Sequence, residues 1–311
     1  MAVNPSYRRF TASEKVAFST YNNIAYDATV RQGLGVAANE KIVGFLYLGT
    51  PSGANRGDKM GMLYDYLTSN AFKLQIEGIV EGFTRFSPTS TPEQLEALGV
   101  LWAEHPECLM QTHLSEQTDE IALVRKLFPN ARDYLDTYET FGLLGGRGLY
   151  GHAIHLEPRE MDRLAEVGAS VVHCPTSNTF IGSGLFNTAG MMAHGIKAGL
   201  ATDTGGGSSF SMLRTMAAAY EIAQLRGVAL HPAQLLWLAT CGSARALHLD
   251  HQIGNIAPGM VADMVVLDLA STPAIAQRSA RAEDIWEEIF PTIMMGDDRA
   301  IAATYVAGQR V

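Results

Sequence analysis

The chain has 311 residues, of which 47% are hydrophobic and 18% are charged, and this composition suits one large or two smaller folded domains rather than a disordered chain. Its formal net charge of -9 argues against nucleic acid as a partner, because phosphate binding needs a basic face. The N-terminus lacks the apolar core of a secretory signal, and no stretch has the roughly 20 apolar residues that span a bilayer, so we expect a cytoplasmic protein without a membrane partner.

The N-terminal segment, residues 1–75, holds apolar runs broken by glycines, including a short candidate strand at Ile42–Leu48, and we leave it unassigned. The first clear helix start follows at Thr91, which offers an N-cap hydroxyl, with Pro92 in the first turn and Gln94 placed to complete a capping box. Apolar residues then recur at helical spacing, which predicts a core-facing stripe at Leu95, Leu98, Leu101 and Trp102.

Strands and helices are predicted to alternate after this helix. The predicted strands are Leu109–His113, Leu149–His152, Ala169–His173 and Ile196–Asp203, and the predicted helices are Asp119–Phe128, Pro158–Val167 and Phe210–Arg226. This alternation is typical of βα units on a parallel sheet, and we assign residues 76–255 to the β/α portion of a barrel. Residues 256–311 read as a small C-terminal β appendage, because Val261–Leu269 and Ala302–Val311 have β character.

Polar side chains follow the predicted strands, at the end where active sites form in parallel barrels. The first such motif is His113-Leu114-Ser115-Glu116. A neutral imidazole at this position can bind zinc, and a carboxylate three residues later can move protons for a metal-bound water. The alternative is a solvated His–Glu pair in a loop.

Two further strand ends carry candidate groups. His152, in Gly151-His152-Ala153-Ile154-His155, is placed to face the barrel mouth, whereas His155 could cap the next helix or lie at the rim. Asp203 ends the fourth predicted strand before three glycines, where a carboxylate can coordinate a metal and accept a proton from its water. Its alternative role is to cap the next helix, for which Ser208 and Ser209 are better placed.

The run His173-Cys174-Pro175-Thr176-Ser177-Asn178 ends the third predicted strand. Its Ser and Asn side chains can hold the following loop through local backbone bonds. For His173 a structural role is favoured over metal binding, and Cys174 reads as a small buried hydrophobe. The groups that remain, His113, Glu116, His152 and Asp203, are predicted to converge at one barrel mouth, which is what hydrolytic metal chemistry needs.

The run from about Phe83 to Val311 resembles the C-terminal part of the guanine deaminases of the amidohydrolase superfamily. The matching stretches are Arg85–Ser90, His113–Glu116, His173–Asn178, Gly182–Phe186, Thr202–Asp203, Ser208–Leu213, Ile256–Gly259, Ala262–Asp263 and Gly296–Arg299. Many deaminases of the superfamily share the histidine, the glutamate and the aspartate, whereas the Gly182–Phe186 loop and the Ser208–Leu213 segment look specific to the guanine branch.

The resemblance implies an α/β fold, a (β/α)8 TIM barrel of the metal-dependent hydrolase type with a small C-terminal β appendage, and a homodimer. It implies deamination of guanine to xanthine and ammonia, by attack of hydroxide bound to one zinc ion on the amino-bearing carbon. His113 and Asp203 would bind the zinc, Glu116 would transfer protons, and His152 would hold the water or the intermediate. Arg85 would bind the polar edge of the base through its fixed fork of donors.

One departure from this family affects the metal site. The family has an early barrel strand that ends in His-x-His, and both histidines bind the metal, but here no histidine precedes His105 and no His-x-His occurs. Because catalytic zinc usually takes three protein ligands, we expect weak metal binding. A barrel that is incomplete at its N-terminus would also leave sheet edges exposed.

Several accounts of this departure are open. The chain could be a truncated or misassembled form of a functional enzyme, which we favour, a degenerate homologue, or a protein whose site is completed by another chain. The alternative functions are a related deaminase that acts on another base or a triazine, and a non-catalytic protein that binds a partner or a purine.

Overall fold

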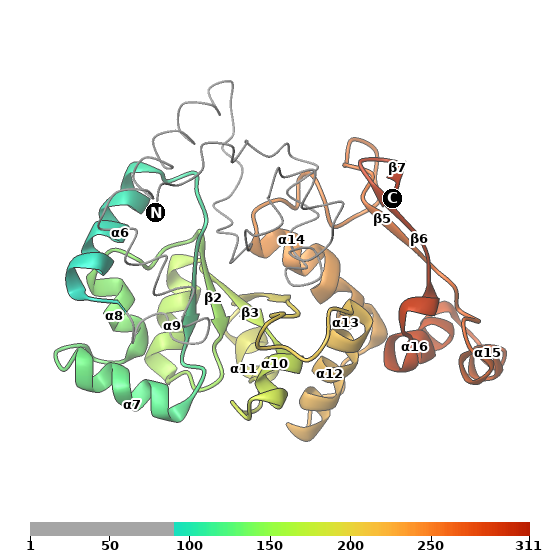
Figure 1. The fold of residues 1–311 in the computed structure, drawn as a ribbon, viewed down its shortest axis with the longest axis horizontal. Coiled ribbons are helices and arrows are strands. Elements are labelled where there is room, and N and C mark those ends of the chain that lie inside the picture. Colours follow the sequence, from blue (N-terminus) through green and yellow to red (C-terminus); the bar gives the residue numbers. More distant parts are fainter. Residues whose placement is uncertain (1–89) are drawn as a thin grey trace, which may run out of the picture.

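The computed structural model describes residues 90–311, which contain a four-stranded parallel sheet flanked by helices and a three-stranded antiparallel sheet near the C-terminus (Figure 1). The parallel strands are neighbours in chain order and comprise β1 (Met110–Leu114), β2 (Gly148–His152), β3 (Ser170–His173) and β4 (Lys197–Leu200). Their ends differ from the predicted ones by at most one residue, except that β4 ends at Leu200 rather than at Asp203. The predicted βα alternation on a parallel sheet is therefore confirmed.

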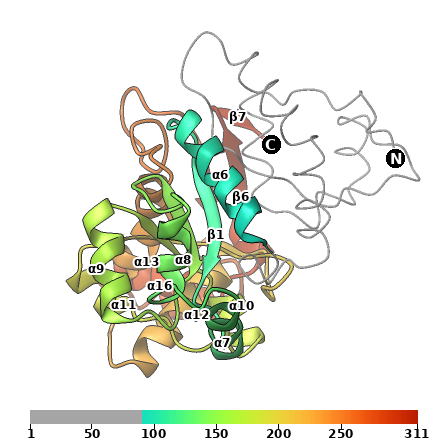
Figure 2. The ribbon, with the colours of Figure 1, turned by 90° about the vertical axis from the view of Figure 1, so that its left-hand side faces the viewer.

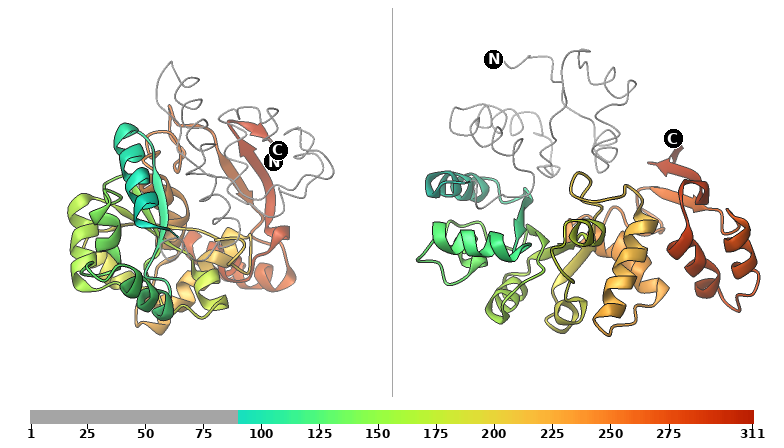
Figure 3. Two further views of the ribbon diagram at one scale, coloured as in Figure 1. Left: turned by 60° about the vertical axis from the view of Figure 1, so that its left-hand side comes forward. Right: turned by 60° about the horizontal axis from the view of Figure 1, so that its bottom comes forward.

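Helices precede and follow these strands. They are α6 (Pro92–Glu104), α7 (Thr118–Leu127), α8 (Tyr134–Thr140), α9 (Pro158–Val167), α10 (Pro175–Phe180), α11 (Thr188–Ala193), α12 (Met212–Leu225), α13 (Pro232–Trp237) and α14 (Ser243–Ala246), with a π-helical turn at Leu238–Gly242 between the last two. Helix α6 runs alongside β1 (Figure 2). The elements then follow one another in chain order toward the C-terminal sheet (Figure 3).

Helix α6 begins where the capping pattern predicts. The Gln94 backbone N–H donates to Thr91 Oγ1 at 3.3 Å, and the Thr91 N–H donates to Gln94 Oε1 at 2.8 Å. This reciprocal pair satisfies two N–H groups that have no partner inside the helix. Leu95 is buried, and Leu98 and Trp102 pack against the same core, so the apolar stripe of α6 faces inward.

The register of the parallel sheet separates its two faces. His113 lies opposite Gly151, and Gly151 lies opposite Val172, so these three positions point to the same face. The other face packs against the helices through a core that includes Leu114, Tyr150 and Val171. His113 therefore lies on the face of the sheet that is turned away from the main helical layer.

The outer edge of β4 is partly covered by the segment that follows α13. The Ala201 N–H donates to His173 O of β3, so the Leu200 N–H points the opposite way, where it donates to Ser243 Oγ at 3.2 Å. A Cβ added to Gly199 would lie 2.9 Å from that hydroxyl oxygen. The sheet edge that we expected to be exposed is therefore closed at this point by a side chain.

The C-terminal segment contains the predicted β elements and two helices that the sequence analysis did not predict. β5 (Met264–Leu267), β6 (Ile301–Val306) and β7 (Gln309–Arg310) form the antiparallel sheet. The helices α15 (Pro273–Ser279) and α16 (Ile285–Met295) lie between β5 and β6, and α16 packs against α12 and α13. Residues 256–311 are therefore not purely β. The division at residue 256 stays a prediction.

A cue for α16 was present in the sequence. Asp284 accepts hydrogen bonds from the N–H groups of Trp286 and Glu287, as an N-cap residue does. Ile289 and Ile293 recur four residues apart and pack in the core of α12 and α13. Within residues 90–311 none of the helices is both long and apolar enough to cross a bilayer.

An ion-pair cluster joins α9 to α8, and we predict that it stabilises the fold. Arg159 donates to both carboxylate oxygens of the buried Asp133 and to Glu139. Arg159→Met is expected to lower the free energy of unfolding by about 1–3 kcal/mol, because the Asp133 carboxylate loses its partner. Arg125→Met, which breaks the exposed pair with Glu157, should cost less than about 1 kcal/mol. Urea denaturation measures both, and equal losses would contradict the prediction.

A buried carboxyl group on α9 should make stability depend on pH. Glu160 accepts hydrogen bonds from the N–H groups of Leu135 and Glu157, but burial raises the pKa of Glu160 to about 7. Because this folded-state pKa lies above the ordinary 4.5, the group stabilises the fold at low pH and loses that contribution as the pH rises through about 7.

Glu160→Gln should therefore gain stability relative to the parent by about 2–3 kcal/mol between about pH 5 and pH 8. Urea denaturation at a series of pH values measures the difference between the two proteins. The exposed Glu104→Gln serves as the control and should follow the parent. Parallel pH profiles for the parent and Glu160→Gln would show that the Glu160 carboxyl is not destabilised by burial.

Candidate active site

The candidate site lies at the carboxyl ends of the parallel strands. His113 is the penultimate residue of β1, His152 ends β2, and Asp203 follows β4. Leu114 and His152 lie opposite each other in the register, so the segments after β1 and β2 leave the sheet at the same level. Parallel strands therefore deliver side chains that are far apart in the sequence to one edge.

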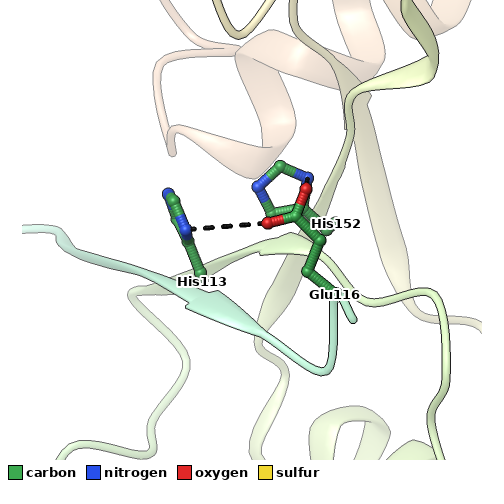
Figure 4. A group of neighbouring side chains, drawn as sticks. All are labelled: His113, Glu116 and His152. Atoms are coloured by element: carbon green, nitrogen blue, oxygen red, sulfur yellow. Dashed lines mark ion pairs between the residues drawn. The ribbon is translucent and has the colours of Figure 1, made fainter. Parts of the chain in front are cut away.

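The predicted residues His113, Glu116, His152 and Asp203 are brought together there. The ring centroids of His113 and His152 are 4.8 Å apart with an edge-to-face angle of 84°. One oxygen of Glu116 lies 4.0 Å from His113 Nδ1 and the other lies 3.3 Å from His152 Nδ1 (Figure 4). On its other side, His152 Nε2 is 4.0 Å from an Asp203 oxygen. Glu116 and Asp203 thus lie next to opposite nitrogens of one imidazole.

Left-handed backbone conformations turn the chain at each of these strand ends. Ser115, His152 and Asp203 have φ values of 47°, 68° and 47°. Non-glycine residues adopt this region only where the surroundings over-determine it, at a cost of order 1–3 kcal/mol each. Sharp turns placed directly after the strands therefore hold the polar side chains over the end of the sheet.

Burial keeps the site imidazoles neutral. It lowers the pKa of His152 to about 3, and the neighbouring His113 and His173 act in the same direction. Burial also lowers the pKa of His113, although the charges of Asp203 and Glu120 oppose the shift. Both rings therefore offer lone pairs rather than positive charge at neutral pH.

The carboxyl groups respond to the same dry surroundings in the opposite direction. Burial raises the pKa of Glu116 to about 7, and the hydrogen bond from Ser183 only partly offsets it. Burial raises the pKa of Asp203 as well, while the hydrogen bond with Ser177 and the nearby His113 act against the shift. A carboxyl group with a pKa near neutrality can both accept and donate a proton, as a general acid–base needs.

These residues form a candidate metal site. Among the described residues, two groups of donor atoms each lie within 4.8 Å of one another: His113, Glu116 and His152, and His152, Cys174 and Asp203. The Nδ1 atom of His113 is buried without a hydrogen-bond partner. Neutral imidazoles and carboxylates are ligands that zinc accepts, so the donor set fits such an ion. Burial raises the pKa of the Cys174 thiol, which makes it a poor ligand.

The other histidine motifs lie around this cluster rather than in it. His173 faces the opposite side of the sheet from its neighbour Val172 and stacks on Phe186, with ring centroids 4.2 Å apart. Burial lowers the pKa of His173 to about 3. His155 Nε2 lies 2.7 Å from the Ser183 carbonyl oxygen and so holds the loop beyond α10. Arg85, the predicted substrate ligand, lies outside the described residues.

Sequence reasoning missed two side chains that contact the cluster. Asn178 was expected, at most, to order the loop that follows it, and Ser183 was given no role, but Asn178 contacts His152 and Glu116, and Ser183 Oγ donates to Glu116. The motif that contains Asn178 was visible in the sequence. Its partners were not, because His152 and Glu116 are 26 and 62 residues away in the chain.

A family model described as the amidohydrolase family matches residues 44–311. The chain belongs to this family. Guanine deaminase from Escherichia coli K12 is 43% identical over 227 residues, which are 73% of this chain and 52% of that protein. Human guanine deaminase is 31% identical over 236 residues, again 73% of this chain and 52% of the relative. The chain therefore spans about half the length of these curated relatives.

Solved structures agree with this assignment. E. coli guanine deaminase superimposes with a TM-score of 0.72 over 73% of this chain and 53% of that one, at 43% identity. A guanine deaminase from C. acetobutylicum with guanine bound in its active site superimposes with a TM-score of 0.66 at 28% identity, over 73% of this chain and 54% of its own. The α/β fold of the TIM-barrel type that we expected is thereby confirmed for this member of the amidohydrolase family.

Proposed function

We propose that the chain carries the catalytic groups of a zinc-dependent hydrolytic deaminase that converts guanine to xanthine and ammonia. The observation that carries the proposal is the buried Glu116 carboxyl, whose pKa is near 7 and which lies between the neutral rings of His113 and His152. The similarity to guanine deaminases supports guanine as the substrate.

His113 and Asp203 would hold the zinc; their donor atoms belong to two neighbouring groups that have His152 in common. When bound, zinc lowers the pKa of a coordinated water to about 7. The His-x-His ligands of the family are absent from this sequence. We therefore propose that His113 and Asp203 define the metal position, with an affinity below that of a site with a complete ligand set.

The reaction adds water to guanine and removes ammonia, and each proton has a residue to carry it. The water oxygen forms a bond to the amino-bearing carbon while Glu116 takes a proton and delivers it to the adjacent ring nitrogen. Asp203 accepts the second proton, and the carbon–nitrogen bond then breaks as the amino group leaves with that proton as ammonia. His152, held neutral, orients the water by hydrogen bonding. Arg85 would bind the polar edge of the base.

A second candidate function is a non-catalytic amidohydrolase homologue, favoured by the absence of His-x-His. The test is ammonia release from guanine, adenine, cytosine and a triazine, with purified protein and added zinc. Turnover of guanine supports the proposal. Turnover of another base with guanine inert would replace it with a related deaminase. Stoichiometric zinc without ammonia release would favour the non-catalytic alternative. A homodimer and a cytoplasmic location stay predictions.

Zinc binding gives the first prediction of this proposal. His113→Ala and Asp203→Asn should each weaken zinc affinity more than about tenfold, since each removes a donor from the cluster. His194→Ala is the matched control, because His194 is an exposed residue at the end of α11 that pairs with Asp162 and belongs to neither donor group. Titration with a zinc-sensitive dye measures the affinities. If all three variants bind zinc like the parent, the metal lies elsewhere.

The proton-transfer role of Glu116 gives the second prediction. Glu116→Gln should lower kcat for guanine by about 10²- to 10⁴-fold, because glutamine cannot carry the proton. Asp119→Asn, an exposed change in the first turn of α7, should leave kcat unchanged. Steady-state ammonia release measures both. Near-parent turnover by Glu116→Gln would remove Glu116 from the mechanism.

A further inference from the structure

The side chain of Asn178 bridges the two groups to which we assign proton and water handling. Asn178 is completely buried in α10. Its Nδ2 atom lies 2.9 Å from His152 Nδ1 and 3.4 Å from Glu116 Oε1. An amide nitrogen has two hydrogens and no lone pair to offer, so it can donate to both neighbours at once.

We propose that Asn178 is a positioning residue that fixes the tautomer of His152, with the ring proton on Nε2, facing Asp203, and the lone pair on Nδ1, facing the amide. This inference rests on the proposed function for the meaning of His152 and Glu116 in the reaction. The tautomer itself is a property of the folded chain that can be measured without turnover.

The contacts around the ring determine where its proton lies. Because Asn178 Nδ2 can only donate, His152 Nδ1 must accept. A neutral imidazole has one acceptor and one donor nitrogen, so Nε2 then carries the hydrogen. This nitrogen lies 4.0 Å from Asp203 Oδ2, on the side of the candidate metal site. His152 is thereby set to donate toward the reacting water.

Two other arrangements compete, and the geometry disfavours both. Rotating the amide would place Asn178 Oδ1 against Glu116 Oε1, a contact that needs the carboxyl proton on that oxygen, which already accepts from Ser183. A hydrogen on His152 Nδ1 could instead point to Glu116 Oε1, but that distance is 3.3 Å, against 2.9 Å to the amide. It would also face the amide hydrogens. The orientation in the structure gives both amide hydrogens an acceptor and leaves Asn178 Oδ1 buried without a hydrogen-bond partner.

The same amide selects one oxygen of Glu116. Oε1 accepts from Asn178 and from Ser183 Oγ at 3.1 Å, and Ser183 in turn accepts from Gln117 Nε2 at 3.1 Å. The lone pairs of Oε1 are thus engaged, which leaves Oε2 to carry the exchangeable proton. Oε2 is the oxygen that faces His113. Asn178 therefore orients the proton of Glu116 toward His113 and that of His152 toward Asp203.

Asn178 also anchors the loop that supplies Ser183. The Ser183 backbone N–H donates to the Asn178 carbonyl oxygen at 2.8 Å, and the His155 ring contacts the Ser183 carbonyl oxygen on the other side. One buried residue thus holds the acid–base carboxyl, the neighbouring imidazole and the loop between them. Loss of the Asn178 side chain would therefore disturb the carboxyl group, the imidazole and the loop together.

The test is long-range nitrogen–proton NMR on protein with ¹⁵N-labelled histidine, with the His152 signals assigned by their loss in His152→Gln. The parent should show His152 Nδ1 at the position of an unprotonated ring nitrogen and Nε2 at that of a protonated one. In Asn178→Leu, which keeps the side-chain volume but removes the donor, the proton should move to Nδ1, whose nearest remaining acceptor is Glu116.

Ser183→Ala is the matched control, because Ser183 contacts Glu116 and not His152, and it should leave the His152 tautomer unchanged. A proton on Nδ1 in the parent, or an unchanged tautomer in folded Asn178→Leu, would overturn the inference. The parent spectrum alone decides if that variant fails to fold. Where guanine is turned over, Asn178→Leu should lower kcat about 100-fold with little change in KM. Absence of turnover would sink the proposed function and leave the tautomer result standing.

Discussion

The structure depends on the parallel register of β1 to β4, which makes four chain segments leave the sheet at one edge. His113, His152 and Asp203 come from three of these ends, and the left-handed turns that follow hold them over the sheet. Since the surroundings are dry, the imidazoles lose their charge and the carboxyl groups retain their protons to higher pH. The chemistry that we propose therefore follows from strand direction and burial together, rather than from the intrinsic properties of any one residue.

Much of this arrangement could be predicted from the sequence. Each predicted strand ends in a polar residue, and parallel strands have a common carboxyl edge, so the convergence of His113, Glu116, His152 and Asp203 follows from pattern alone. The capping box at Thr91 is likewise a local signal with a local cause. These features need only neighbours in the chain, or a rule that applies to every strand of the sheet.

The features that were missed depend on contacts between distant segments. Asn178 looked like a loop residue because its partners, Glu116 and His152, are separated from it by 62 and 26 positions. Helix α16 was not predicted because it lies between two runs of β character, although its N-cap Asp284 and its apolar spacing were local signals. Arg85 lies outside the described residues, so its proposed contact with substrate stays a prediction.

The Ser243 hydroxyl restricts the addition of a strand to the β4 edge of this sheet. By accepting from the Leu200 N–H, Ser243 takes the place that the carbonyl of an added strand would need. Ser243 also lies so close to Gly199 that a side chain there would clash with the hydroxyl. A strand added next to β4 would therefore first have to displace the segment around α14.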